Sequence, residues 1–287
     1  MAYNTGSDPT LAQQITAGFN PAMFSKGAIM HTKSALVCAN AVNQNWRSQL
    51  KYGHTLTIPV FSEATTSEVT PGTRVAGQNL AGTPATITID QWRQAPVEIS
   101  DMADIENLAD YMAGAQESCG FAISKYIDTT INTLFSTLSS SSPYGNDGQT
   151  MTEDIIIAIR EGLRAADVPD PEKWAVIGDA SMEADMYNIE KFSNSLYGAA
   201  GVAQTGMIGK VYGMKVLITQ NLTDATSGSY GCILHPDAIG LVMQENPRSQ
   251  LTRINDEFMT HITVDAIWGV AEIRDAFGKS FYTRSTG

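Results

Sequence analysis

The stretch that decides the fold runs from residue 104 to residue 138 and reads DIENLADYMAGAQESCGFAISKYIDTTINTLFSTL. Its apolar residues recur mostly at steps of three or four, or multiples of these, which places them on one face of an α-helix. This apolar stripe consists of Ile105, Leu108, Met112, Cys119, Ile123, Ile127, Ile131, Leu134 and Leu138. We therefore predict one long helix with a buried face, and we expect Ile127 to be a structural residue of that face.

The predicted helix is unusually long for the size of the chain. A helix over 104–138 would measure ~50 Å, at about 1.5 Å per residue. A compact ball of this length would have a radius of gyration of about 19 Å, so the helix would cross it from side to side. We therefore predict a flat, extended chain with this helix as its spine. The opposite helix face, which we expect to be polar and solvated, carries Glu106, Asp110, Gln116, Glu117, Lys125 and Asp128.

The composition excludes several classes of function. The 287 residues include 30 Asp and Glu against 18 Lys and Arg, for a net charge of -12. Such an acidic surface repels phosphate, so we expect only non-specific proximity to DNA. The three cysteines, Cys38, Cys119 and Cys232, are far apart in sequence and indicate buried thiols rather than disulfides. We find no apolar run of membrane-spanning length and no export signal at the start of the sequence, so we expect no contact with a membrane.

Two unusual segments precede the long helix. Residues 1–52 are interrupted by Gly and Pro and hold sparse apolar clusters, such as Phe19, Met23 and Phe24, which favours an arm that lies on another surface. Within 53–92, two alternating runs around Leu56 and Ile87 flank a polar stretch rich in Thr and Gly. We predict that this segment folds back on itself as a projecting two-stranded ribbon, which needs a partner surface to be stable.

After the helix, the sequence predicts a mixed α+β body. Apolar periodicity indicates helices that begin near residues 150 and 179, with a short buried strand at 174–177 between them. Further strands are predicted at 215–219, 229–234, 240–244, 258–264, 266–273 and 280–284.

The sequence lacks the motifs of common enzyme classes. It contains no GxSxG elbow, no Walker loop and no HExxH pattern. Its four histidines, which are far apart in the chain, are His31, His54, His235 and His261. We therefore expect no catalytic residue, no cofactor and no metal ion, and we predict that the protein is not an enzyme.

One local pattern carries a resemblance to a known family. The stretch GMIGKVYGMKV at 206–216, followed by Asn221-Leu222, resembles a stretch of the tailed-bacteriophage major capsid proteins. The flanking stretches at 159–177 and 235–241 resemble the helix, the Val-Pro turn and the strands of the same family. Within the pattern, we expect Gly209 and Gly213 to allow turns between short strands, where a side chain would cause strain.

The resemblance implies the Hong Kong 97-like capsid fold, with an N-terminal arm, an extended β-hairpin loop, a spine helix, and peripheral and axial domains. It places the arm at 1–52, the hairpin loop at 53–92 and the spine helix at 104–138. The peripheral domain then comprises 93–142 and 240–265, and the axial domain comprises 143–239 and 266–287.

The resemblance also implies a structural role. Members of this family assemble as pentamers and hexamers into an icosahedral shell around double-stranded DNA, with a portal and often a scaffolding or cement protein as partners. Such a chain would assemble in the host cytoplasm and end in the virion. Two alternatives stay open from sequence: a shell of the same fold that encloses cargo enzymes, and a soluble α+β enzyme.

Some members of the family join their subunits by an isopeptide bond from a hairpin-loop lysine to a neighbouring asparagine. Here no lysine lies between Lys51 and Lys125, so the ribbon cannot supply that nucleophile. We therefore expect non-covalent locking through ribbon strands, the arm clusters and an ion pair of Arg74 with a carboxylate.

Overall fold

The computed structural model of the protein describes most of the chain from residue 37 onward. The described segments are 37–46, 50, 52–61, 63–80, 82–101, 111–138, 143–189 and 209–284. The predicted arm clusters at Phe19, Met23 and Phe24 and the predicted helix start at 104–110 lie outside the described residues.

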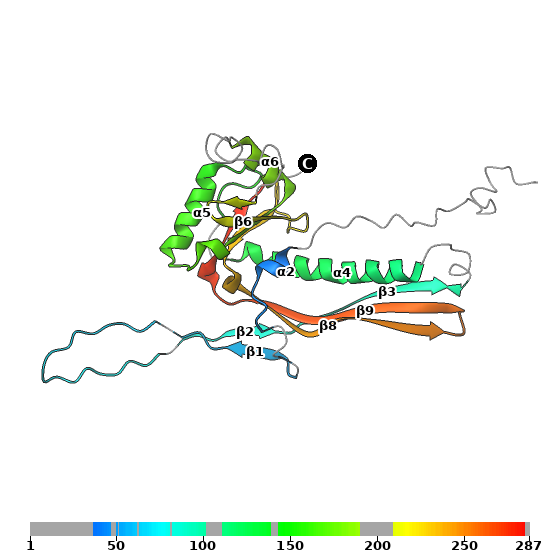
Figure 1. Ribbon diagram of the computed structural model, residues 1–287, viewed down its shortest axis with the longest axis horizontal. Coiled ribbons are helices and arrows are strands. Elements are labelled where there is room, and N and C mark those ends of the chain that lie inside the picture. The colour runs from blue at the N-terminus through cyan, green and yellow to red at the C-terminus, as the bar shows by residue number, and fades with distance from the viewer. Residues whose placement is uncertain are drawn as a thin grey trace, which may run out of the picture.

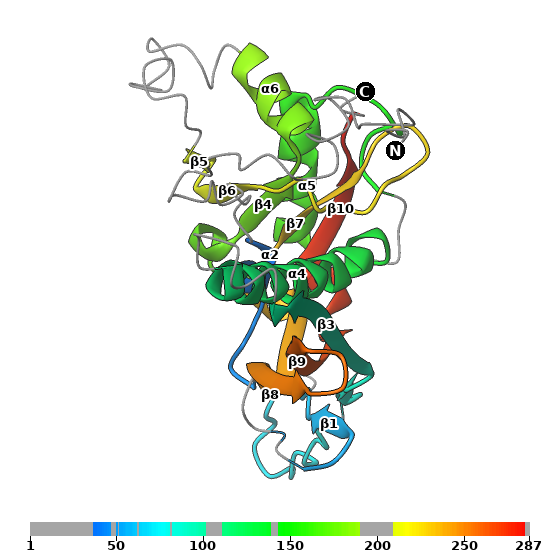
Figure 2. The same cartoon turned by 90° about the vertical axis from the view of Figure 1, so that its right-hand side faces the viewer.

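The molecule has a compact unit and a long flat limb that meet at a corner (Figure 1). The compact unit holds a five-stranded sheet with helices, and the limb holds a three-stranded sheet lined by helix α4 (Tyr111–Thr133). A two-stranded hairpin lies below the corner, and its loop extends away from the limb (Figure 1). Viewed along the long axis, the compact unit, α4, the limb sheet and the hairpin are stacked in that order (Figure 2). The prediction of an extended α+β chain is confirmed.

The limb sheet has the strand order β3-β9-β8, and both pairings are antiparallel. Its strands are β3 (Gln91–Ser100), β8 (Ile239–Ile254) and β9 (Met259–Glu272). β8 shifts register twice, between Met243 and Glu245 and between Glu245 and Arg248. Such bulges bend a strand and increase its twist.

Helix α4 lies along one face of the limb sheet and ends in a 3-10 turn, η1 (Leu134–Ser136). Within the described part, most of the predicted apolar stripe is buried, with Ile127 only 6% exposed, whereas Met112 and Leu134 are partly buried. The stripe shares one core with Val264, Ala266 and Trp268 of β9. These three residues alternate along the strand, as expected when one sheet face is covered and the other is open.

Two parts of the limb sheet were not predicted from sequence. β3 contains Pro96, and the outer half of β8 contains Pro247, and both residues argue against a central strand. The structure places both strands at the edges of the sheet, where a missing N–H removes no ladder bond. The predicted break near residue 265 is wrong, because β9 runs without interruption from Met259 to Glu272.

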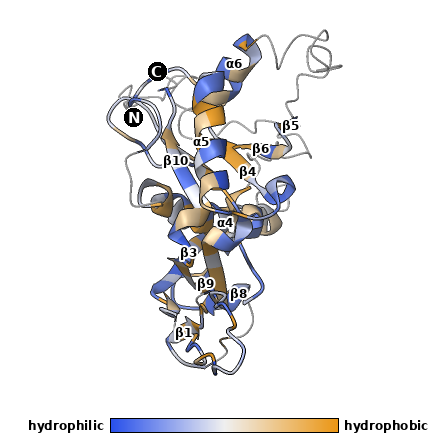
Figure 3. Ribbon diagram, turned by 90° about the vertical axis from the view of Figure 1, so that its left-hand side faces the viewer, coloured by the Kyte–Doolittle hydropathy of each residue, from blue (hydrophilic) through white to orange (hydrophobic). Residues whose placement is uncertain are grey.

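The compact unit is built on a sheet with the order β10-β7-β4-β6-β5, in which only β4 and β6 are parallel. Its strands are β4 (Ala175–Gly178), β5 (Lys210–Val211), β6 (Met214–Ile218), β7 (Tyr230–Leu234) and β10 (Gly278–Tyr282). Helices α5 (Glu153–Ala165) and α6 (Ala180–Asn188) form a core with Val176 of β4. The neighbouring Ala175 and Ile177 belong instead to the core around α4. β4 is therefore buried on both faces, and it carries the apolar colour in Figure 3.

The predicted ribbon is present as β1 (Thr55–Ile58) paired with β2 (Ala85–Thr88) in an antiparallel register. At its root, Ile87 and Ile89 form a small core with Leu50 and with Val242 of β8. The ribbon is thus attached to the limb sheet only at its base, and its long loop projects from there.

Candidate assembly surfaces

The described residues hold no cluster of metal-ligating side chains. Among them, no group of three His, Cys, Asp or Glu side chains is placed to hold a metal ion. Within the same part of the chain, no helix is long and apolar enough to cross a membrane. The three cysteines are all buried free thiols, as predicted.

The side chain of Asp128 on α4 binds the backbone of residues 37–39. Its carboxylate accepts backbone N–H bonds from Val37 at 3.0 Å, Cys38 at 3.4 Å and Ala39 at 3.0 Å. These groups open the short helix α2 (Cys38–Ala41), so Asp128 supplies the acceptor that the first turn of a helix lacks. Burial raises the pKa of Asp128, and the three backbone bonds oppose that shift. The expectation that Asp128 faces solvent is therefore wrong.

One helical turn later, Asn132 makes a second polar contact from α4. Its side-chain amide donates to the carbonyl of Asn221 at 2.7 Å, and both residues are buried. Because Asp128 and Asn132 are four residues apart, they share one side of the helix. The spine helix thus fixes α2 with one side chain and a loop of the compact unit with the other.

The hairpin loop, residues 59–84, contacts little of its own chain. Phe61 is 71% exposed and Val69 is 72% exposed, and Val75 and Leu80 are exposed as well. The loop still has defined local structure, because Thr73 N–H donates to the Thr70 carbonyl and closes a turn around Pro71 and Gly72, which has φ +86°.

The two arms of the loop are also joined at one point along their length. The side chain of Gln78 donates to the Thr65 carbonyl at 2.6 Å and accepts from the Thr65 N–H at 3.0 Å. One glutamine thus copies a pair of ladder bonds between the two arms. A shaped loop with exposed apolar side chains is typical of a surface that another molecule covers.

The root of the hairpin crosses β9 at a glycine. A Cβ added to Gly269 would overlap the carbonyl oxygen of Thr88, at the end of β2. Gly240 of β8 similarly leaves room for Ile87. Backbone of the hairpin therefore lies directly on backbone of the limb sheet, which sets the direction in which the loop leaves.

The limb face opposite α4 is polar and carries one exposed aromatic side chain, Trp92, which is 73% exposed. Next to it, Arg248 of β8 pairs with Asp265 of β9 through two hydrogen bonds of 2.9 and 3.0 Å. The Arg248 guanidinium holds the pKa of Asp265 below its usual range, and Trp92 also hydrogen-bonds this carboxylate. Because Arg248 neutralises its charge, Asp265 can be buried within the continuous strand β9.

The tip of the limb presents a second exposed aromatic residue. Phe258, in the turn between β8 and β9, is 70% exposed and has a φ of +49°. Its carbonyl accepts the N–H of Asp101 at 3.0 Å, and Asp101 also pairs with Arg253. A bulky residue in the left-handed region costs energy, so the surrounding bonds hold it in place.

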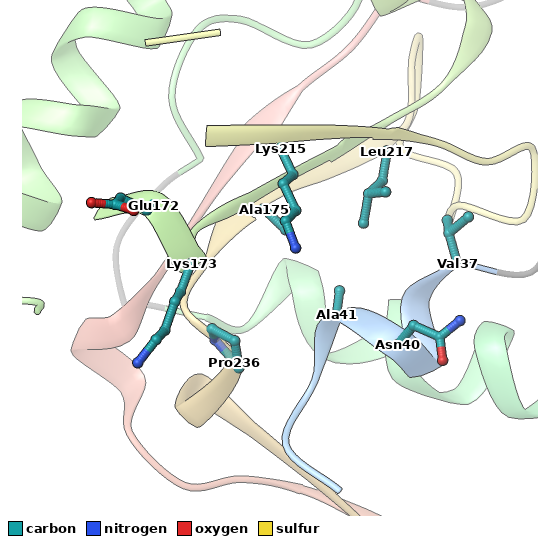
Figure 4. Close-up of a pocket in the computed structure, with 9 residues that line it drawn as sticks. All are labelled: Val37, Asn40, Ala41, Glu172, Lys173, Ala175, Lys215, Leu217 and Pro236. Atoms are coloured by element: carbon teal, nitrogen blue, oxygen red, sulfur yellow. The ribbon is translucent and has the colours of Figure 1, made fainter. Parts of the chain in front are cut away.

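A pocket of about 320 Å³ lies between α2 and the compact unit (Figure 4). Its lining residues are Val37, Asn40, Ala41, Glu172, Lys173, Ala175, Lys215, Leu217 and Pro236. Lys215 and Leu217 point from β6 toward α2, whereas Glu172 points away from the other side chains (Figure 4). Lys173 is paired with Asp170 at 2.7 Å. The pocket is lined mainly by apolar side chains, with Glu172, Lys173 and Lys215 at its charged side.

The structure places the predicted site residues in different environments. Gly213 and Tyr212 both have positive φ in the two-residue turn between β5 and β6, which is the geometry of a type I′ turn. Gly209 has no positive φ, and an added Cβ would meet nothing within 4 Å, so the expected strain at this position is absent. Arg74 is exposed on the hairpin loop and forms no ion pair within the described part of the chain. Ile127 lies in the core around α4.

No family model matches the sequence, and no curated protein matches it. Solved structures do share the fold. A structure from Mycobacterium phage Che8 has a TM-score of 0.78 and 19% identity, covering 92% of this chain and 97% of that one. The capsid structure of the cyanophage P-SCSP1u has a TM-score of 0.75 and 16% identity, covering 92% and 93% of the two chains.

The match extends to almost the full length in another case. The head structure of Helicobacter pylori bacteriophage KHP40 has a TM-score of 0.69 and 11% identity, and the alignment covers 99% of each chain. At such low identity the shared feature is the fold. Over most of its length, the chain therefore has the fold of the tailed-bacteriophage major capsid proteins.

Proposed function

We propose that this chain is the major capsid protein of a tailed bacteriophage, which assembles as pentamers and hexamers into an icosahedral shell around double-stranded DNA. The observation that carries the proposal is the hairpin loop. It is braced and shaped, yet its apolar side chains, among them Phe61 and Val69, are uncovered. At about 3.3 Å per residue, each arm of the loop reaches ~40 Å from its root. We infer that a second copy of the chain covers the loop. In a closed symmetric shell, each copy presents the same surfaces to its neighbours, so the loop of one copy meets the same surface of the next.

The proposed division of the chain follows the capsid fold. We assign 1–52 to the arm, 53–92 to the hairpin loop, and 93–142 with 240–265 to the peripheral domain. The axial domain then comprises 143–239 and 266–287. The two separate sheets support this division, and the uninterrupted β9 contributes to both sides of the 265/266 boundary.

The proposed partners follow from the same role. The chain binds other copies of itself, and a scaffolding protein, a portal and a cement protein act with it during assembly. Its acidic surface lies near the packaged DNA without binding a particular sequence. The protein acts as a structural component of the virion, without catalysis, after assembly in the host cytoplasm.

Two measurements test this function. The purified, refolded chain should sediment as large closed particles, and electron microscopy should show shells. A chain that stays monomeric over a wide concentration range would contradict the proposal. Particles from producing cells should contain double-stranded DNA, and particles filled with protein instead would contradict the genome-enclosing role while leaving the shell intact.

A further inference from the structure

Two connections between the compact unit and the limb sheet run side by side at the corner. Residues 235–238 join β7 to β8, and residues 273–277 join β9 to β10. His235 N–H donates to the Phe277 carbonyl at 2.9 Å, and Ile273 N–H donates to the Ala238 carbonyl at 2.8 Å. We call residues 235–239 and 272–277 the seam. The seam determines how β8 and β9 leave the compact unit.

His235 closes one side of the seam in its neutral form. Its Nδ1 accepts the N–H of Asp237 at 3.2 Å and so caps the short 3-10 helix η4 (Pro236–Ala238). The ring proton therefore lies on Nε2, which is buried without a partner among the described residues. The ring also packs edge-on against Phe277, at 5.7 Å between centroids.

A second proton on His235 would have to bind Nδ1, which would remove the cap. The freed Nδ1–H would then turn to the Asp237 carboxylate, 3.6 Å away, which now accepts a bond from Asn43. Burial lowers the pKa of His235, and the cations Lys173 and Arg274 act in the same direction, against Asp237 and Asp170.

Glu272 lies on the other side of the seam. It is the last residue of β9, and its carboxyl group hydrogen-bonds Asp275 of the 3-10 helix η5 (Asp275–Phe277). Its Oε1 is buried without a partner within the described part of the chain. Burial, followed by the charge of Asp275, raises the pKa of Glu272 to about 7. The buried thiol of Cys232 on β7 is the other titratable group that senses this carboxyl group.

We propose that the seam is a proton-operated latch, which is closed while His235 is neutral and the Glu272–Asp275 pair holds one proton. When both carboxyl groups ionise, their repulsion separates η5 from the end of β9. When His235 gains a proton, η4 loses its cap. Either event loosens the corner of the molecule, while the cores around α4 and α5 stay intact.

The two groups respond to a change of pH in opposite directions. The pKa of Glu272 lies above its ordinary value of 4.5, so its stabilising contribution is complete below pH 4.5 and is lost as the pH rises through about 7. The pKa of His235 lies below its ordinary value of 6.5, so its contribution is complete above pH 6.5 and is lost as the pH falls through the lowered pKa. The latch is therefore tightest between these two pKa values.

Hydrogen–deuterium exchange of the full chain between pH 4.5 and pH 9, corrected for intrinsic exchange rates, tests the latch. Peptides that cover the seam should lose protection by about tenfold from pH 6 to pH 8.5, which is less than the full shift of Glu272 implies because Glu272 is only partly buried. They should also lose protection at acid pH. Glu272→Gln should abolish only the alkaline loss. His235→Asn should abolish only the acid loss, because the asparagine oxygen still accepts the Asp237 N–H.

The controls make the test specific. Glu98→Gln removes an exposed carboxylate from β3 and should leave both losses unchanged. If Glu272→Gln does not fold, Asp275→Asn should reduce the alkaline loss, because the repulsion between two carboxylates is gone, and should move its midpoint to lower pH, because Glu272 then loses its charged neighbour. An alkaline loss that persists in Glu272→Gln, a midpoint unmoved in Asp275→Asn, or equal losses in peptides of α5 would overturn the proposal.

Discussion

The compact unit and the hairpin loop contain similar apolar side chains and use them in opposite ways. In the compact unit, Ile156, Ile159 and Leu163 of α5 are completely covered by their own chain. In the loop, Phe61 and Val69 are more than two-thirds exposed. The apolar side chains of the first region are covered by their own chain, whereas those of the second have no cover. Substitutions in the two regions should therefore separate folding from assembly.

The largest expected effect is on the core around the spine helix. Ile127→Asp places a charge among buried apolar neighbours and should cost several kcal/mol of stability. We expect insoluble or unassembled protein, measured by solubility and circular dichroism. Ala122→Asp, on the exposed face of the same helix, is the matched control and should stay folded. Normal shells from Ile127→Asp would show that the buried stripe is wrongly placed.

The next effect concerns the polar contacts of the spine helix. Asp128→Ala leaves three backbone N–H groups of α2 without their acceptor and should destabilise the chain by about 1–3 kcal/mol. A lower melting temperature and faster proteolysis near residue 37 would show it. Lys125→Ala, one turn earlier on the exposed side, should change neither. Equal behaviour of the two variants would refute the role of Asp128.

A smaller effect is expected where the hairpin crosses the limb. Gly269→Ala adds a methyl group that overlaps Thr88, so β2 must shift, at a cost of about 1–3 kcal/mol. Because the shift redirects the loop, we expect shell yield to fall more than the melting temperature. Gly209→Ala adds the same group in open space and is the control. Unchanged assembly in Gly269→Ala would mean that the loop direction does not depend on this crossing.

Substitutions in the hairpin loop should separate stability from assembly most clearly. The double change Phe61→Ser with Val69→Ser removes exposed apolar surface, so stability should change by less than about 0.5 kcal/mol. Particle formation, followed by sedimentation, should nevertheless be lost or strongly reduced. Thr66→Ser in the same loop serves as the control. Full assembly of the double variant would remove the main support for the proposed function.

We expect no covalent cross-links between the subunits of a particle. Since no lysine lies between Lys51 and Lys125, the loop cannot form an isopeptide bond through a lysine amine. Particles boiled in detergent and reductant should run as a single band near 30.9 kDa. A ladder of multimers would reveal a covalent lock of another kind.

Prolines are the reason why β3 and the outer half of β8 were not predicted as strands. Pro96 and the Asn246-Pro247 pair look like breaks, because a proline in a central strand removes a ladder bond. At an edge, one row of N–H groups faces outward, and a proline there has no such cost. Whether a strand is central or at an edge is a property of the sheet, so no local pattern around Pro96 could have revealed it.

The buried polar residues were missed for a related reason. Asp128 and Asn132 follow Ile127 and Ile131 by one position, which is a place at the margin of the apolar stripe. A charged residue there usually faces solvent, as we predicted. It is buried here because α2, some 90 residues earlier, brings three free N–H groups to it.

The sequence by itself determined the long spine helix, the ribbon before it and the α+β body after it, because these follow from the period of apolar residues and from turn chemistry. Gly213 also belongs to this group, since a two-residue hairpin turn requires positive φ. The tertiary structure alone decided the edges of the limb sheet, the burial of Asp128 and the meeting of His235, Glu272 and Asp275 at the seam. These features depend on contacts between segments distant in sequence, and their energies come from burial and from partners that no local pattern contains.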